Sequence, residues 1–125
     1  LPKAEVAGFD LSSYAIDSSP PEVRNRLFVH RAEEPYPFGS DSFDLVLSLM
    51  TLHNVALPAL GIALSEIERV GRNKFVAVES YRTVAEQFNL QCWALTCETF
   101  LRPEGWIWLF DTAGYTGDYE FAFFE

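Results

Sequence analysis

The sequence predicts one α/β domain in which a mostly parallel sheet carries helices on both faces. Strand-like and helix-like segments alternate along the chain, and this order implies right-handed crossovers between parallel strands. A nearly continuous apolar run, Phe43–Met50, is typical of a strand buried on both faces of a parallel sheet. The length of 125 residues fits a single domain, 1–125, and leaves no room for two ordinary ones.

The first part of the chain contains two predicted strands. Glu5–Phe9 has the pattern of a short strand and is followed by the acidic Asp10, after which Leu11–Ile16 forms a turn and a helix start. Ser18–Glu22 contains two prolines and is expected to break any helix, because proline lacks an N–H donor and restricts the residue before it. Leu27–His30 is the second predicted strand.

The middle of the chain contains a loop, two strands and a helix. The loop Glu33–Ser42 is followed by Phe43–Met50, which we expect at the centre of the sheet. Apolar residues at helical spacing predict a helix from about Pro58 to about Val70, with Gly71 as its C-cap. The next strand is Lys74–Ser80. The helix has a polar face made by Ser65, Glu66, Glu68 and Arg69.

The last third is less regular. Tyr81–Leu90 is compatible with a helix, whereas Cys92–Cys97 is too short to distinguish helix from strand. Pro103–Asp111 is predicted to be a helix, because proline is favoured in a first turn, and Gly114 is expected to end it. Tyr119–Phe124 is the final predicted strand.

Composition excludes several classes of protein. With 49% hydrophobic and 22% charged residues, the chain has enough apolar surface to fold. A formal net charge of −9 argues against a broad nucleic-acid-binding surface. No apolar run is long enough to span a bilayer and no signal segment opens the chain, so we expect a cytoplasmic protein without a membrane partner. Cys92 and Cys97 have no second pair nearby, so we expect neither a metal site nor a disulfide.

Polar residues that follow the strands are the candidate site, because ligands of open α/β sheets bind beyond the carboxyl ends of the strands. Asp10 follows the first strand, and a carboxylate there can accept hydrogen bonds from both hydroxyls of a ribose. The structural alternative, in which Asp10 is a turn or helix N-cap residue, fits this position equally well and stays open.

Four segments together resemble a known family. They are VAGFDLS at 6–12, AEEPYPF at 32–38, DSFDLVLS at 41–48 and LSEIERV at 64–70. In order and spacing they are similar to the class I methyltransferases that use S-adenosylmethionine. The resemblance implies a Rossmann-like sheet and transfer of a methyl group from S-adenosylmethionine to an acceptor, which we expect to be a small molecule.

The resemblance assigns a set of residues to the cofactor. Asp10, with Leu11 beside it, stands where the family's acid holds the ribose hydroxyls. The loop that contacts the adenine corresponds to Ala32 and Glu33. At the end of the fourth strand of the family, the positions that line the cofactor are Ser48 and Leu49.

The chain departs from the family pattern in two places. Where the family often has an Asp before Ala32, this chain has Arg31, which leaves the Ala32 backbone amide for the adenine contact. The family's first strand and Gly-rich turn are expected some tens of residues before Leu1, and the seven glycines here do not form such a turn. We therefore expect a partial domain that lacks its first strand, is inactive alone, and exposes two strand edges through which it forms homo-oligomers.

The acceptor side has two catalytic candidates, His53 and Tyr81. His53 follows the predicted central strand, and histidine is the side chain best suited to general base catalysis near neutral pH. Glu79 is placed to orient these groups or to hold an acceptor amine. Two alternatives remain, since methyl transfer needs mainly alignment and exclusion of water, and a single His is often a loop or capping residue.

Two other functions are compatible with the same residues. The first is a non-catalytic remnant whose sheet edges and aromatic surface form an oligomerisation or interaction module. The second is another nucleotide-binding α/β enzyme, such as a dehydrogenase, although that class also needs an upstream Gly-rich loop. The aromatic residues of the last third suit an acceptor pocket, but they fit core packing better, because Trp106 and Phe110 would share one helical face.

Overall fold

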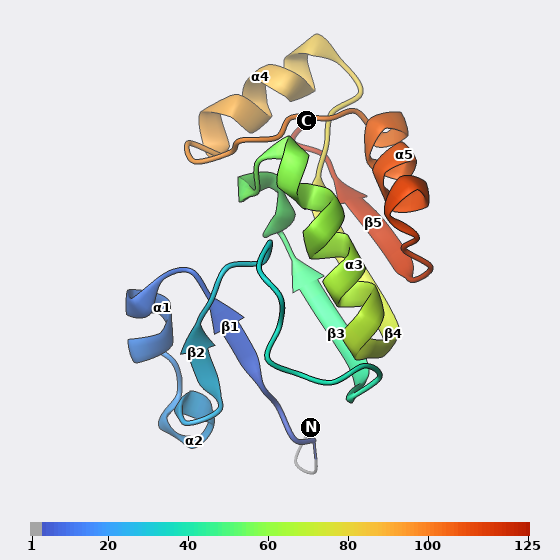
Figure 1. Cartoon of the computed structure of the whole chain (residues 1–125). Coiled ribbons are helices and arrows are strands. Elements are labelled where there is room, and N and C mark those ends of the chain that lie inside the picture. Colours follow the sequence, from blue (N-terminus) through green and yellow to red (C-terminus); the bar gives the residue numbers. More distant parts are fainter. Residues whose placement is uncertain (1–3) are drawn as a thin grey trace.

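The computed structural model describes residues 4–125 and has two groups of parallel strands (Figure 1). Strands β1 (Gly8–Asp10) and β2 (Leu27–Val29) pair with each other. Strands β3 (Phe43–Leu49), β4 (Gly71–Glu79) and β5 (Asp118–Ala122) form a second sheet in the order β3–β4–β5. Every pair is parallel, so the prediction of an α/β fold with parallel strands is confirmed.

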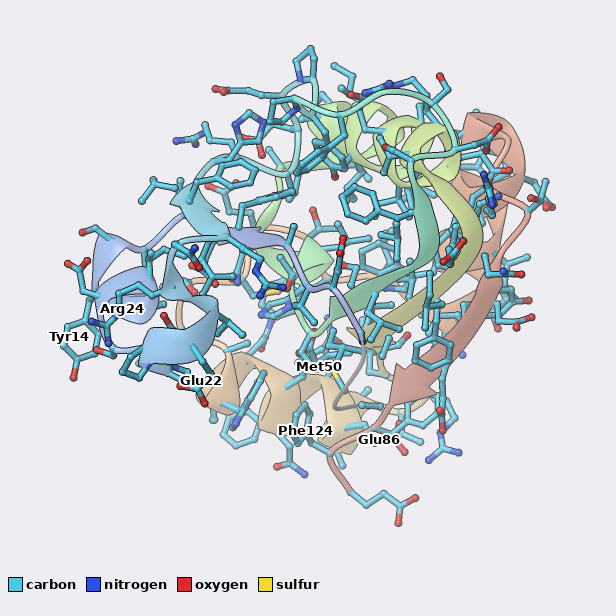
Figure 2. All side chains as sticks on the ribbon, turned by 90° about the horizontal axis from the view of Figure 1, so that it is seen from below. Tyr14, Glu22, Arg24, Met50, Glu86 and Phe124 are labelled. Atoms are coloured by element: carbon cyan, nitrogen blue, oxygen red, sulfur yellow. The ribbon has the colours of Figure 1, made fainter. Side chains whose placement is uncertain are left out.

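Two short helices connect β1 to β2. Helix α1 (Ser13–Asp17) begins after Ser12, whose Oγ accepts a hydrogen bond from the Ala15 amide. Helix α1 ends at Asp17, in agreement with the helix break predicted at Ser18–Glu22, but helix α2 (Pro21–Arg24) begins at a proline inside that segment and was not predicted. The first N–H of a helix has no partner inside the helix, and proline therefore loses nothing there. Figure 2 shows Tyr14, Glu22 and Arg24 on this outlying part of the molecule.

Helices α3 (Leu60–Val70) and α5 (Pro103–Ala113) form the core with β4. A 3₁₀ turn, η2 (Leu57–Ala59), precedes α3 where the sequence predicted helix. Gly114 ends α5 with a left-handed φ of 74°, as expected from its position. The largest fully buried apolar side chains of this core are Trp106, Phe110, Leu52, Leu60, Leu64, Val70, Val76 and Val78. Each contributes about 1.5–3 kcal/mol through removal of apolar surface from water.

Helix α4 (Val84–Trp93) lies at the carboxyl ends of β4 and β5 (Figure 1). Thr83 caps it, because its Oγ1 accepts a hydrogen bond from the Glu86 amide at 3.1 Å. The helix ends three residues after Leu90, where the sequence predicted its end. The start of the ambiguous segment Cys92–Cys97 is therefore helical. Cys92 is exposed and neither cysteine is in a disulfide.

Strand β3 lies at an edge of its sheet, so the prediction that Phe43–Met50 forms the centre is wrong. Strand β4 is central among the described strands and β3 pairs only with it. One face of β3 is also open: Leu45, Leu47 and Leu49 are 55–56% exposed. The apolar run shows that the strand is suited to burial, but within residues 4–125 no element covers this face or pairs with the outer edge.

Two chain reversals fix the ends of β3 and β4. Met50 has a left-handed φ of 54°, which ends β3 and turns the chain into a second 3₁₀ turn, η1 (Leu52–Asn54). At the other end, α3 passes into β4 without a connecting residue, and Gly71 is its C-cap as predicted. A Cβ at Gly71 would lie 2.7 Å from Val46 Cγ2, so this close contact requires glycine.

Candidate functional site

The strands of both sheets point in the same direction, so their carboxyl ends share one edge of the molecule (Figure 1). At this edge lie Asp10, the loop after β2, the end of β3 with η1, and Glu79 at the end of β4. These are the places from which the sequence predicted site residues. An edge of this kind is the usual ligand-binding position in open α/β sheets.

Asp10 is the exposed last residue of β1, directly before the turn into α1. Its Oδ1 accepts a hydrogen bond from the Ser12 amide at 2.8 Å, so the structural role considered from the sequence, a turn residue, is present. Within residues 4–125 the side-chain hydrogen bonds engage only Oδ1, which leaves Oδ2 free to accept others. Leu11, next in the chain, is exposed.

Ala32 and Glu33 follow β2 in a turn. The Ala32 carbonyl accepts a hydrogen bond from Tyr36 Oη at 3.0 Å, whereas its N–H donates to no group among the described residues. Arg31 Nε lies 2.9 Å from Glu33 Oε1. The hydrogen bond from Arg31 holds the pKa of the Glu33 carboxyl below its ordinary value. Arg31 therefore pairs within the turn, and the Ala32 amide is the available donor.

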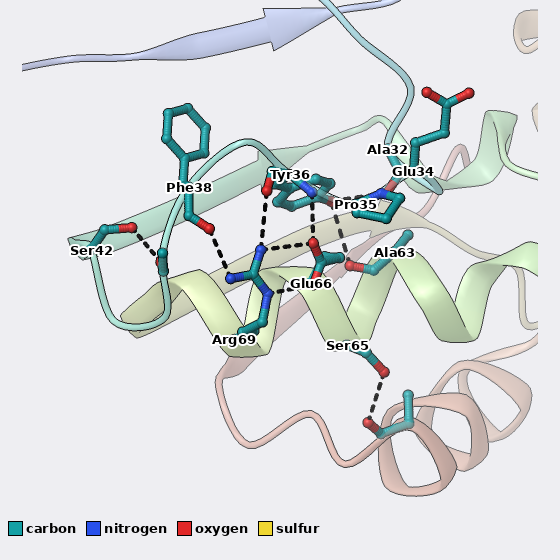
Figure 3. Close-up of polar contacts among 12 residues, drawn as sticks. Ala32, Glu34, Pro35, Tyr36, Phe38, Ser42, Ala63, Ser65, Glu66 and Arg69 are labelled. Carbon is teal, nitrogen blue, oxygen red and sulfur yellow. Dashed lines mark hydrogen bonds and ion pairs between the residues drawn. The ribbon is translucent and has the colours of Figure 1, made fainter.

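A loop clamp, made by Tyr36, Glu66 and Arg69, fastens the chain after β2 to helix α3 (Figure 3). Glu66 accepts hydrogen bonds from the Tyr36 amide at 2.6 Å and from Arg69 Nε at 2.6 Å. Arg69 also donates to the carbonyls of Phe38 at 2.8 Å and Tyr36 at 3.1 Å. The Glu66 side chain is only 13% exposed, so Glu66 belongs to this contact with the loop and not to a purely solvated helix face.

In the loop clamp, hydrogen bonding lowers the pKa of Glu66, whereas burial raises the pKa of Tyr36. The hydrogen bonds that Glu66 accepts, first from Arg69 and then from the Tyr36 amide, lower its pKa below the ordinary value. Burial raises the pKa of the Tyr36 hydroxyl, with the negative charge of Glu66 adding to the effect. The clamp therefore has an ionised carboxylate beside a neutral phenol at neutral pH.

Ser48 and Leu49 occupy consecutive positions at the end of β3. Side chains of consecutive strand residues point to opposite faces, and Ser48 is half-buried on the side of Val76 whereas Leu49 is exposed on the other face. Their side chains therefore lie on different faces of the sheet, while their backbone lies at the common edge.

His53 and Glu79 form a buried acid–base pair. His53 Nδ1 lies 2.6 Å from Glu79 Oε2, and the two side chains are 5% and 0% exposed. The distance is short, but the angles between His53 Nδ1 and Glu79 Oε2 fall outside those of a full hydrogen bond. The other carboxylate oxygen, Glu79 Oε1, has no hydrogen-bond partner among the described residues. We treat the two groups as paired, because a contact of 2.6 Å between two buried polar atoms needs a proton between them.

Aromatic residues border this pair. The Trp93 ring lies 6.1 Å from the His53 ring, measured between centroids, and stacks on Phe124 at 4.8 Å. By contrast Trp106 and Phe110 are buried on one face of α5, which confirms the prediction of core packing for those two residues.

Tyr81 and Arg82 follow Glu79 but have different surroundings. Tyr81 is half-buried, and its hydroxyl makes no hydrogen bond with the described residues. Arg82 binds the Glu86 carboxylate at 2.6 Å, the Glu125 carboxylate at 3.0 Å, and packs 3.9 Å above the centroid of the Phe123 ring. Those contacts direct Arg82 to α4 and to the end of the chain.

An open groove lies at the opposite ends of the strands. It is lined chiefly by Val6, Leu27, Phe28, Phe38 and Phe43, so it lies where β1, β2 and β3 begin. The groove is apolar and contains none of the predicted site residues. Among residues 4–125 no three or more His, Cys, Asp or Glu side chains are grouped to hold a metal ion. No helix in this part of the chain is both long and apolar enough to cross a membrane.

Comparison with known proteins identifies the family. A family model described as a methyltransferase domain matches residues 1–78, which is more than half of the 125 residues. The match spans the elements from β1 almost to the end of β4 and includes the loop clamp and His53. Searches of curated proteins and of solved structures give no significant match. From the family match and the parallel α/β fold, we conclude that this chain belongs to the class I S-adenosylmethionine-dependent methyltransferases.

Proposed function

We propose that the complete protein transfers a methyl group from S-adenosylmethionine to a small-molecule acceptor. Free polar groups at the carboxyl edge of the strands support this proposal. Asp10 Oδ2 is a free acceptor suited to ribose hydroxyls, and the Ala32 N–H is a free donor suited to an adenine nitrogen. In this proposal Leu11, Glu33, Ser48 and Leu49 complete the contacts with the cofactor.

On the acceptor side, His53 and Tyr81 are the proposed catalytic residues. When bound, S-adenosylmethionine supplies a sulfonium methyl group: the sulfur–carbon bond breaks with its electron pair passing to sulfur, while the acceptor atom bonds to the methyl carbon and loses its proton. His53 takes that proton, and Tyr81 contributes a phenol near the acceptor. The loop clamp supports the site by fixing the chain that carries Ala32 and Glu33.

The test is calorimetric titration of the complete protein with S-adenosylmethionine. Asp10→Ala is expected to weaken binding by about 1.5–3 kcal/mol, or roughly 10- to 150-fold, because hydrogen bonds to a charged group are lost. Asp17→Ala is the matched control, since Asp17 is also exposed and lies at the far end of α1. Equal affinities of Asp10→Ala and the unmodified protein would remove Asp10 from the site.

We also propose that the sheet is completed by one further strand between β1 and β3. The outer edges of both strands are unpaired within residues 4–125, and the apolar groove lies where they begin. Without this strand we expect residues 1–125 to bind the cofactor weakly or not at all and to be inactive. A cytoplasmic location stays a prediction from the sequence.

The second candidate function is an oligomerisation or interaction module. The exposed leucines of β3, Leu45, Leu47 and Leu49, favour it, because they extend along an unpaired strand edge. We expect residues 1–125 to self-associate in analytical ultracentrifugation and Leu47→Lys to shift the equilibrium toward monomer. Ile62→Lys, which changes an equally exposed residue on α3, should have no such effect. A chain that is monomeric without either substitution would contradict this candidate.

A further inference from the structure

We infer that Glu79 is a positioning residue that holds the His53 imidazole with its proton on Nδ1, so that Nε2 is the ring nitrogen that accepts a proton. The chemical class of acceptor that fits this arrangement carries an O–H or N–H group. The catalytic role of Nε2 rests on the proposed methyl transfer. Which ring nitrogen of His53 carries the proton can be measured without any methyl transfer.

The His53 and Glu79 side chains are in close contact in a buried site. His53 Nδ1 and Glu79 Oε2 are 2.6 Å apart, and both side chains are at least 95% buried. A carboxylate oxygen and an unprotonated ring nitrogen both present lone pairs, which repel at this separation. When the imidazole has one proton and Glu79 is ionised, the contact is attractive only if that proton is on Nδ1.

The two ring nitrogens of His53 have different surroundings. Nδ1 is enclosed and faces the carboxylate, whereas Nε2 makes no hydrogen bond with the described residues and is not among the enclosed atoms. Nε2 is therefore the nitrogen at which a proton can be taken up. The product of that uptake is an imidazolium beside a carboxylate, and the two opposite charges stabilise each other in a buried site.

The backbone of His53 is fixed by hydrogen bonds. The His53 carbonyl accepts two hydrogen bonds, from the amides of Glu98 at 2.9 Å and Thr99 at 3.0 Å. Thr99 in turn donates through Oγ1 to the Val55 carbonyl at 2.7 Å. These contacts hold η1 against the segment after α4, so that Glu79 needs only to set the orientation and the protonated nitrogen of the ring.

The experiment is long-range ¹H–¹⁵N NMR of the imidazole rings in the ¹⁵N-labelled chain, at a pH where the rings are neutral. The chain has two histidines, and a His30→Gln variant assigns their signals. His30 is an internal reference for the opposite tautomer, because its Nε2 lies 3.1 Å from the Pro35 carbonyl, which can only accept. We expect Nδ1–H for His53 and Nε2–H for His30.

Two variants separate positioning by Glu79 from a general effect of charge. Glu79→Met removes every acceptor at nearly constant side-chain length, and we expect His53 to lose its Nδ1–H signature. Glu98→Met removes the exposed carboxylate of a residue whose backbone amide binds the His53 carbonyl, leaves that backbone hydrogen bond in place, and should keep the signature. Loss of the signature only in Glu79→Met supports the inference.

Either of two results would overturn the inference that Glu79 positions His53. The first is an Nε2–H tautomer of His53 in the unmodified chain, and the second is an unchanged Nδ1–H signature in Glu79→Met. The first result needs no variant, so the inference remains testable even if Glu79→Met does not fold. Titration of the complete protein with S-adenosylmethionine measures the proposed function separately. Absence of cofactor binding together with the expected tautomers would reject the proposed function and leave the positioning role intact.

Discussion

Two acid–base contacts of the molecule differ in how fully their polar atoms are used. In the loop clamp, Glu66 accepts hydrogen bonds from a backbone amide and a guanidinium, and Arg69 donates to two backbone carbonyls as well. In the other contact, His53 and Glu79 are more deeply buried, yet Glu79 Oε1 has no hydrogen-bond partner among the described residues.

The difference indicates two different roles. A network whose members are all hydrogen-bonded stabilises the fold, because no buried group is left without compensation for lost hydration. A buried pair with an unsatisfied oxygen contributes little stability and is retained more readily for chemistry than for folding. Three predictions test this contrast, in order of decreasing effect on the free energy of unfolding.

The largest effect is expected from Glu66→Ala. This change removes the carboxylate of the loop clamp, so that the Tyr36 amide loses its acceptor and Arg69 keeps only its hydrogen bonds to two backbone carbonyls. We expect a loss of about 3 kcal/mol in urea unfolding at pH 7. Glu34→Ala is the control, because Glu34 is an exposed residue of the same loop and its side chain makes no hydrogen bond among the described residues. Similar losses in both variants would mean that the clamp has no special role.

A smaller effect, about 2 kcal/mol at pH 7, is expected from Glu66→Gln, which keeps the shape but removes the charge. The pKa of Glu66 is lower in the folded chain than its ordinary value of 4.5. Its contribution to stability is therefore complete above about pH 4.5 and is lost as the pH falls through the lowered pKa. Urea unfolding between pH 7 and pH 3 should show a steeper loss for the unmodified chain than for Glu66→Gln. Parallel curves for the two chains would contradict this account.

The smallest effect is expected from Glu79→Met, although the Glu79 carboxylate is more buried than that of Glu66. Methionine fills the space, and His53 can remain neutral without its partner, so the change in unfolding free energy should be about 1 kcal/mol or less. A loss as large as that of Glu66→Ala would show that the His53–Glu79 pair is mainly structural.

The sequence predicted the elements whose signals are local. Pro103 at the start and Gly114 after the end define α5, and apolar spacing defines most of α3. Helix α2 was missed because Pro21 disrupts a helix interior but is favoured at the first position. The position of β3 in its sheet was wrong for another reason: an apolar run shows that a strand is suited to burial, but not which element covers it.

The site was predictable in location but not in its contacts. Residues after strands were expected at one edge, and Asp10, His53 and Glu79 do lie there. The distance between His53 and Glu79 depends on how η1 leaves β3 through the left-handed Met50, for which the sequence contains no glycine signal. The loop clamp joins residues about 30 positions apart, and Glu66 and Arg69 alone have the pattern of an ordinary polar helix face.

The direct passage of α3 into β4 at Gly71 makes the site sensitive to changes in chain length. Successive residues of β4 point to opposite faces, with Val78 in the core and Glu79 beside His53. Insertion of one residue at this junction would move Val78 to the position beside the imidazole, whereas deletion of one residue would move Glu79 to the core position of Val78. Length variation among related chains is therefore expected in the loop 33–42 and not between Val70 and Gly71.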